Sequence, residues 1–130
     1  PLHVEQQGEG QIGPQARVVR AQLDGLARLL SLDRPFLARL GVTDAQQRLV
    51  PAMARKWKQI NKFLETLDAA LDASPLAAAT RIEVLDFGAG KGYLTFALHD
   101  HLRHALGRDA QVTGVELRPE LVALCNGIVD

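Results

Sequence analysis

Hydrophobic residues in the C-terminal part of the chain follow the spacing of a strand, a helix, a second strand and a second helix. Residues 82–87 form a β-prone run too apolar for a half-exposed strand, which predicts a parallel strand with helices on both faces. Apolar residues then recur at helical spacing over residues 94–105, and Gly107 is a natural stop. A second strand is predicted at residues 111–116, and Pro119 fits the first turn of another helix. This order of elements is typical of a parallel α/β sheet.

The first part of the chain has helical spacing instead. Residues 1–13 are polar and glycine-rich, which predicts a mobile lead-in. Residues 14–73 predict a helical region, and residues 74–80, with Ser-Pro and an alanine run, predict a linker into the first strand. Residues 81–130 are long enough for only two strands, one crossover helix and the beginning of another helix.

Several helices are predicted within residues 14–73. A helical stripe covers residues 18–30, and a short helix at residues 36–40 is closed by a glycine. The Thr-Asp-Ala-Gln sequence at residues 43–46 has the form of a capping box and predicts another helix start. Pro51 either kinks that helix or opens the next one, and the longer helix follows with an apolar side over residues 57–71.

A glycine-rich loop connects the first predicted strand to the helix after it. Gly88, Gly90 and Gly92 let the backbone turn sharply and approach a ligand, because a Cβ would clash or forbid positive φ. The free N–H groups at the helix start favour an anionic or strongly polar ligand group. Asp86 lies near the strand's carboxyl end, where open α/β sheets bind ligands. Glu116 ends the second strand, 24 positions after Gly92, about where a ribose-binding carboxylate is expected.

Spacing separates the candidate nucleotide cofactors. The dinucleotide fingerprint G-x-G-x-x-G requires a third glycine where this chain has Tyr93, which disfavours NAD. A phosphate-binding P-loop requires G-x-x-x-x-G-K-[S/T], whereas Lys91 lies between two glycines here, so ATP binding through a P-loop is excluded.

The sequence of residues 86–92, Asp-Phe-Gly-Ala-Gly-Lys-Gly, resembles motif I of class I S-adenosylmethionine-dependent methyltransferases, an acid followed by G-x-G-x-G. The resemblance implies an α/β fold with a Rossmann-like parallel sheet, of which only the first βαβα portion is present, after an α-helical region. It also implies methyl transfer with S-adenosylmethionine as the cofactor. Residues 81–130 would then be the first part of the cofactor-binding domain.

The resemblance also implies a role for each matching residue. The glycine loop would approach the methionine part of the cofactor, and Glu116 would hold both ribose hydroxyls. Asp86 would help to orient the amino group, directly or through water, and Leu117 would lie near the adenine. The cofactor-binding residues expected in this way are Asp86, Phe87, Gly88, Ala89, Gly90, Gly92, Tyr93, Glu116 and Leu117.

Residues 56–63 ahead of motif I look similar to a group of methyltransferase-domain proteins with helical N-terminal regions. Two parallel strands have exposed edges and little core, so the chain is expected to be the N-terminal portion of a longer protein. The acceptor side of a methyltransferase, usually supplied by later strand ends, would then be largely absent. This piece is not expected to catalyse by itself, and the acceptor stays open between RNA, protein and a small molecule.

Composition excludes few classes of protein. The chain of 130 residues is 47% hydrophobic with 15 basic and 15 acidic residues, as in an ordinary soluble domain. Its single cysteine, Cys125, excludes an internal disulfide and is expected to be a small core residue. No apolar run reaches membrane-spanning length or resembles a signal peptide, so a cytoplasmic location is expected.

Two clusters of charged or titratable residues could have further roles. Arg55, Lys58 and Lys62 share a helical face and could meet the phosphates of a nucleic acid or an acidic partner. A solvated helix face is the favoured interpretation, because the chain as a whole is neutral and no recognised nucleic-acid module accompanies the cluster. The alternative function is a non-catalytic RNA- or protein-binding scaffold with a methyltransferase-like fold. The histidines at 99, 101 and 104 lack the i, i+4 spacing of a zinc motif, so no metal site is expected, and no catalytic residue is assigned.

Overall fold

The computed structural model describes residues 2–6 and 30–129. The chain divides into two compact units. Of the described residues, 2–6 and 78–129 belong to one unit, which we call the sheet unit, and 30–77 belong to the other, which we call the helical unit. Most of the helical stripe predicted at residues 18–30 lies outside the described residues.

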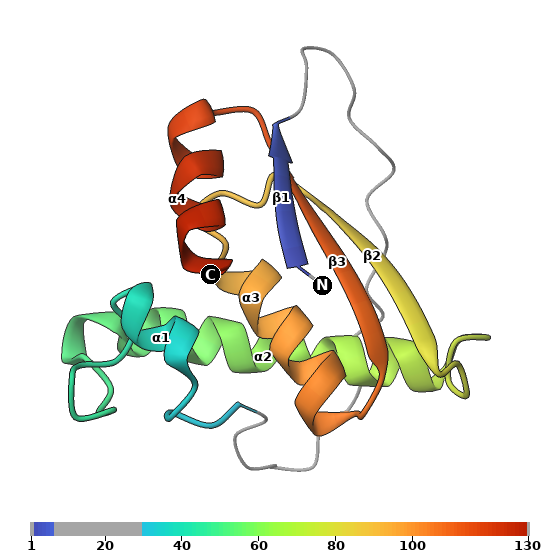
Figure 1. Ribbon diagram of the computed structural model, residues 1–130. Helices are drawn as coiled ribbons and strands as arrows, with labels where there is room; N and C mark the ends of the chain where they lie inside the picture. Colours follow the sequence, from blue (N-terminus) through green and yellow to red (C-terminus); the bar gives the residue numbers. More distant parts are fainter. Residues whose placement is uncertain (1, 7–29, 130) are drawn as a thin grey trace. The chain divides into compact units, whose positions relative to one another are not determined.

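The sheet unit is built on three parallel strands. They are β1 (Leu2–Gln6), β2 (Arg81–Phe87) and β3 (Asp109–Glu116). β3 lies in the middle, between β1 and β2 (Figure 1). Phe87 is in register with Val115, and Gln6 is in register with Glu116, so the carboxyl ends of the strands meet at one edge. The two strands predicted from the sequence are confirmed, and with them a mixed α/β fold on a parallel sheet.

The prediction of a mobile lead-in needs correction at Leu2–Gln6, which pair with β3 as strand β1. Leu2 and Val4 are buried. The Asn126 side chain accepts a hydrogen bond from the Val4 N–H and donates one to the Val4 carbonyl, both at 3.2 Å. The Asn126 side-chain amide therefore pairs with the Val4 backbone as a neighbouring strand would. The residues of β3 that pair with β1 are more than 100 positions away in sequence. The local sequence, with two apolar residues in a polar segment, therefore gave little indication of a strand.

Two helices belong to the sheet unit. α3 (Tyr93–Asp100) continues into a π-helical turn (His101–Ala105), and α4 is Pro119–Val129. Both were predicted, and Gly107 at φ 63° follows the first of them as expected. α3 packs closely on β3 at Gly114, where an added Cβ would lie 3.2 Å from Cγ2 of Thr95. The glycine in β3 thus permits the close approach of the helix.

One face of β2 is more exposed than its composition predicts. Ile82 is 4% exposed, whereas Leu85 is 63% and Phe87 is 49% exposed. Burial therefore alternates along the strand, and the prediction of helices on both faces is wrong for the described residues. Apolar composition shows that a strand can be buried on both faces, but burial also requires elements that cover each face.

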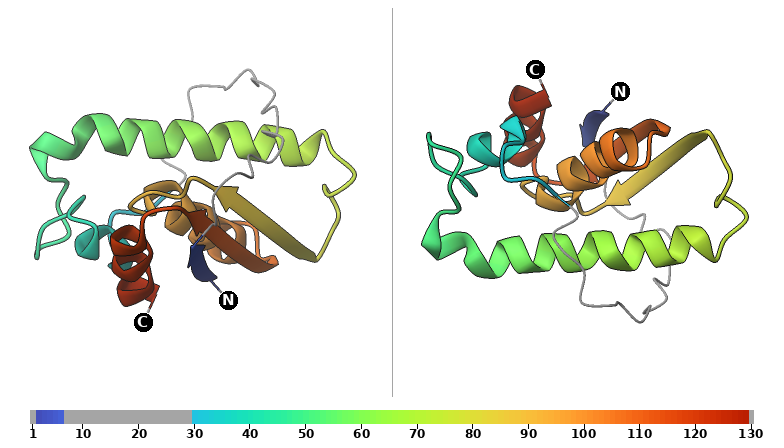
Figure 2. Two further views of the ribbon diagram at one scale, coloured as in Figure 1. Left: turned by 90° about the horizontal axis from the view of Figure 1, so that it is seen from above. Right: turned by 90° about the horizontal axis from the view of Figure 1, so that it is seen from below.

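The helical unit contains α1 (Pro35–Arg39), a 3₁₀ turn η1 (Pro51–Met53) and α2 (Ala54–Asp72). α1 confirms the predicted short helix. α2 is a straight helix (Figure 2). It has 19 residues, and its apolar side is buried at Trp57, Ile60, Leu64 and Leu71. Within residues 2–6 and 30–129, no helix is long and apolar enough to cross a membrane.

The capping-box prediction at residues 43–46 is wrong, because these residues form a turn. Oδ1 of Asp44 accepts hydrogen bonds from the N–H groups of Gln46, at 2.9 Å, and Arg48, at 3.0 Å. Gln47 has a left-handed φ of 63°, which does not continue a helix. Aspartate often supplies such local bonds in turns, in competition with helix formation. Pro51 instead opens the 3₁₀ turn that leads into α2, which is one of the two roles that the sequence left open for this proline.

Candidate functional site

The candidate site lies at the edge where β2 and β3 end. The N–H groups of Gly88 and Ala89 both donate to the carbonyl of Val115, at 2.7 and 3.1 Å. The glycine loop therefore turns over the end of β3, next to Glu116. Parallel pairing brings together a loop and an acid that are more than 20 residues apart in sequence.

The three loop glycines all have positive φ, which L side chains rarely adopt. Gly88 is at 75°, Gly90 at 61° and Gly92 at 87°. Only Gly92 also lacks room for a side chain, because an added Cβ would lie 2.8 Å from Cε2 of Phe96 and 3.0 Å from Sγ of Cys125. Gly92 is the N-cap of α3, with no capping side chain, so the helix starts directly at the loop. The first two glycines serve backbone conformation, and the third also serves packing.

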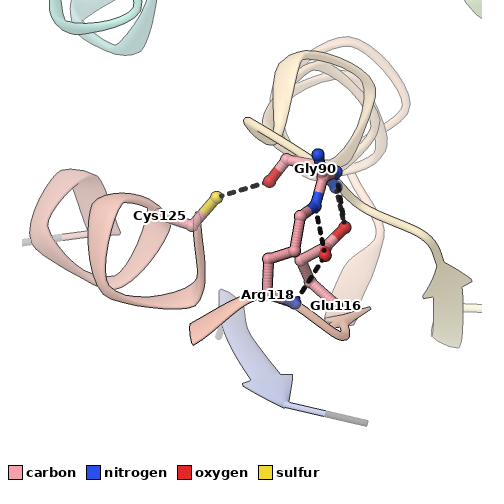
Figure 3. A network of polar contacts seen from close by, with 4 residues as sticks. All are labelled: Gly90, Glu116, Arg118 and Cys125. Carbon is pink, nitrogen blue, oxygen red and sulfur yellow. Dashed lines mark hydrogen bonds and ion pairs between the residues drawn. The ribbon is translucent and has the colours of Figure 1, made fainter. Parts of the chain in front are cut away.

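Glu116 is the centre of a hydrogen-bond network at the end of β3 (Figure 3). Glu116 is only 4% exposed. Oε1 accepts from the Gly90 N–H at 3.1 Å and from Nη2 of Arg118 at 3.2 Å. Oε2 accepts from the backbone N–H of Arg118 at 2.8 Å and from its Nε at 3.0 Å. These donors, above all the Arg118 side chain, lower the pKa of Glu116 to about 2, so the carboxylate is ionised at neutral pH.

Asp86 contacts the first turns of α3. Its Oδ2 accepts a hydrogen bond from the Thr95 hydroxyl at 2.6 Å, and Thr95 is fully buried. Asp86 is half-buried, consistent with a polar role at the edge of the sheet. This hydrogen bond links the carboxyl end of β2 to α3, the helix that follows the glycine loop.

Phe87, Ala89 and Leu117 were also predicted at this site, and each is adjacent in sequence to one of its residues. Phe87 and Leu117 are 49% and 53% exposed and follow Asp86 and Glu116 directly. Ala89 packs against β3, with its Cβ 3.0 Å from the position of an added Cβ on Gly114. The edge therefore offers exposed apolar side chains beside a buried carboxylate.

The sequence did not identify three residues that hold this site together: Thr95, Arg118 and Cys125. Cys125 was assigned to the core, and it is fully buried. Its Sγ–H also donates to the Gly90 carbonyl at 3.4 Å, opposite the N–H that Glu116 binds. Burial raises the pKa of the thiol, which keeps the proton needed for this bond. In the sequence, Cys125 could be recognised only as a residue on the apolar face of the last helix. That position did not indicate that the glycine loop lies against this face.

In the part of the chain that the structure describes, no three His, Cys, Asp or Glu side chains are grouped so that they could hold a metal ion. Burial lowers the pKa of His99 to about 4, so this imidazole is neutral at pH 7. His99 is half-buried near the end of α3.

A parallel α/β sheet with a glycine loop, a helix N-terminus and a buried acid at its carboxyl edge defines a class of protein that binds ligands at that edge. A family model described as a methyltransferase domain matches residues 55–130, more than half of the chain. The chain therefore belongs to this methyltransferase-domain family, which confirms its resemblance to methyltransferases. Searches of curated proteins and of solved structures found no match.

Proposed function

We propose that this protein transfers a methyl group from S-adenosylmethionine, and that the carboxyl edge of the sheet unit is the cofactor site. The observation that carries the proposal is the buried Glu116 carboxylate, hydrogen-bonded to the Gly90 N–H of the glycine loop. Membership of a methyltransferase-domain family supports it, because such domains generally use this cofactor.

The residues present fit the cofactor chemically. A buried, ionised carboxylate is a strong acceptor for the two hydroxyls of a ribose. The packing around Gly92 leaves no space for a side chain, which keeps the loop backbone in its tight turn. The exposed side chains of Phe87 and Leu117 offer an apolar surface on which an adenine ring could stack.

The bound cofactor would supply a methyl group made electrophilic by its positive sulfonium. The chain's own task is to hold the donor in place and to keep water away from it. Glu116 would fix the ribose, the glycine loop would hold the methionine part, and Asp86 would orient the amino group. The acceptor's nucleophile forms the new bond to carbon as the carbon–sulfur bond breaks, and the electron pair of that bond stays on sulfur.

Calorimetry with S-adenosylhomocysteine tests the proposal. We expect binding to the wild type that weakens at least tenfold, about 1.4 kcal/mol, in Glu116→Ala, with no heat from NAD. The matched control is Glu83→Ala, which removes an exposed carboxylate from the other end of the sheet and should bind as the wild type does. A folded wild type that binds no S-adenosylhomocysteine would overturn the proposal.

We also propose, as a second candidate, that α2 contacts RNA. Arg55, Lys58 and Lys62 are exposed on α2 at positions i, i+3 and i+7, and the only ion pair found for them in the described chain is between Lys62 and Glu65, at 3.7 Å. A triple alanine variant should then weaken binding to single-stranded RNA and reduce the salt dependence, by about 0.7 per lost phosphate contact. RNA binding without any affinity for S-adenosylhomocysteine would favour the scaffold function over methyl transfer.

A further inference from the structure

The Glu116 carboxylate has no free acceptor position in the structure. A carboxylate offers about four lone-pair sites, and four N–H groups donate to this one. Two of them are backbone groups, of Gly90 and Arg118, and the other two belong to the Arg118 guanidinium (Figure 3). A ribose diol therefore cannot bind Glu116 until two of these donors leave.

The two pairs of donors differ in how readily they can leave. The backbone donors are fixed by the loop and by the end of β3. The Arg118 side chain is 60% exposed, while the Glu116 side chain is 4% exposed. The guanidinium can thus rotate into water by changing its own torsions, without movement of the strand or the loop.

We propose that the Arg118 guanidinium occupies the place of the two ribose hydroxyls in the free protein and is displaced when the cofactor binds. The inference rests on the proposed function and adds a step of regulation at the same site. The count of hydrogen bonds supports the exchange. When Nε–H and Nη2–H depart, each carboxylate oxygen loses one hydrogen bond and keeps one from the backbone, and the two hydroxyls of a diol would restore one bond to each oxygen.

The exchange explains why an exposed arginine lies over a buried acid. Without cofactor, Arg118 compensates a buried negative charge that would otherwise be costly to leave unpaired. With cofactor, the two hydroxyls donate hydrogen bonds to the carboxylate in place of the guanidinium. The Arg118 side chain therefore balances the charge of Glu116 when the site is empty. It also reduces the apparent affinity for the cofactor by the free energy needed to displace the guanidinium.

Calorimetry on Arg118→Ala tests the inference. We expect S-adenosylhomocysteine and adenosine to bind about two- to fivefold more tightly than to the wild type, which is the range for a partly exposed ion pair. Binding of 2′,3′-dideoxyadenosine should not change, because it has no hydroxyls to replace the guanidinium. Arg81→Ala is the control, since Arg81 forms an exposed pair with Glu83 at the other end of the sheet.

The outcomes separate the inference from the proposed function. Equal or weaker binding of S-adenosylhomocysteine to Arg118→Ala, with normal wild-type binding, would overturn the inference alone. No binding to either protein would overturn the proposed function and the exchange with it.

A measurement on the wild type covers the case in which the variant fails to fold. The Arg118 Nε–H resonance should show a hydrogen-bonded proton in the free protein and should move to the position of a solvent-exposed arginine when S-adenosylhomocysteine saturates the site. A resonance that stays in place at saturation would contradict the displacement.

Discussion

The two edges of the sheet unit carry the same kind of ion pair in different surroundings. At the carboxyl edge, Arg118 lies 3.0 Å from Glu116, two residues away in sequence. At the amino edge, Arg81 lies 3.1 Å from Glu83, at the same separation. The Glu116 side chain is 4% exposed and the Glu83 side chain 68%. Residue type, spacing and distance are nearly equal, so burial is what separates a candidate site from an ordinary surface pair.

The glycines at the two edges repeat this contrast. Gly92 and Gly107 both have positive φ, at 87° and 63°. A Cβ at Gly92 would meet Phe96 and Cys125, whereas a Cβ at Gly107 would meet nothing within 4 Å. The chain is closely packed around Gly92 at the carboxyl edge, whereas Gly107 at the amino edge has room for a side chain.

The largest effect is expected from Gly92→Ala. Left-handed strain and overpacking against buried side chains should together lower the free energy of unfolding by about 2–4 kcal/mol. Gly107→Ala should cost only the strain, about 1 kcal/mol. Urea unfolding of both variants measures the difference, and equal losses would show that packing at Gly92 adds nothing.

A smaller effect, with a defined pH dependence, is expected from Glu116→Gln. Loss of charge-assisted bonds in a buried network should lower the free energy of unfolding by about 1–3 kcal/mol at pH 7. The pKa of Glu116 is about 2 in the folded protein against an ordinary value of 4.5. The unfolded state therefore binds more protons, and the advantage of the wild type should be complete above pH 4.5 and disappear as the pH falls towards 2.

Urea unfolding at several pH values between 7 and 3 checks this prediction. Glu83→Gln is the control and should change stability by less than about 0.5 kcal/mol. A difference between wild type and Glu116→Gln that does not change with pH would mean that the carboxylate is not held in its charged form.

Thr95→Val tests the second acid of the carboxyl edge. The substitution removes the 2.6 Å bond to Asp86 while it keeps the shape of the side chain. We expect a loss of about 1–2 kcal/mol. Thr66→Val, which removes a hydroxyl bonded to the Lys62 carbonyl on a helix surface, should change stability by less than about 0.5 kcal/mol. Equal effects in a thermal unfolding assay would argue against a structural role for the Asp86–Thr95 bond.

The smallest effect is expected from Arg81→Ala. An exposed ion pair contributes about 0.2–1 kcal/mol at most, and added salt screens it. Unfolding in low and high salt should differ little between this variant and the wild type. A loss as large as that of Glu116→Gln would contradict the view that burial separates the two edges.

The sequence by itself determined the elements whose causes are local. The apolar run of β2, the loop glycines, the helices that follow and the acid at the end of β3 were all found from spacing, because each depends on neighbours a few residues away. The family was suggested by the resemblance of residues 86–92 to motif I of methyltransferases, and the family model that matches residues 55–130 confirms it.

Only the tertiary structure decided which of these residues touch. β1 pairs with residues more than 100 positions away, and Cys125 bonds to a loop 35 residues earlier. Asp44 formed a turn where the local pattern favoured a helix. The contrast between Glu116 and Glu83 also appeared only after folding, because burial is set by the packing of distant segments and not by a residue's own type or spacing.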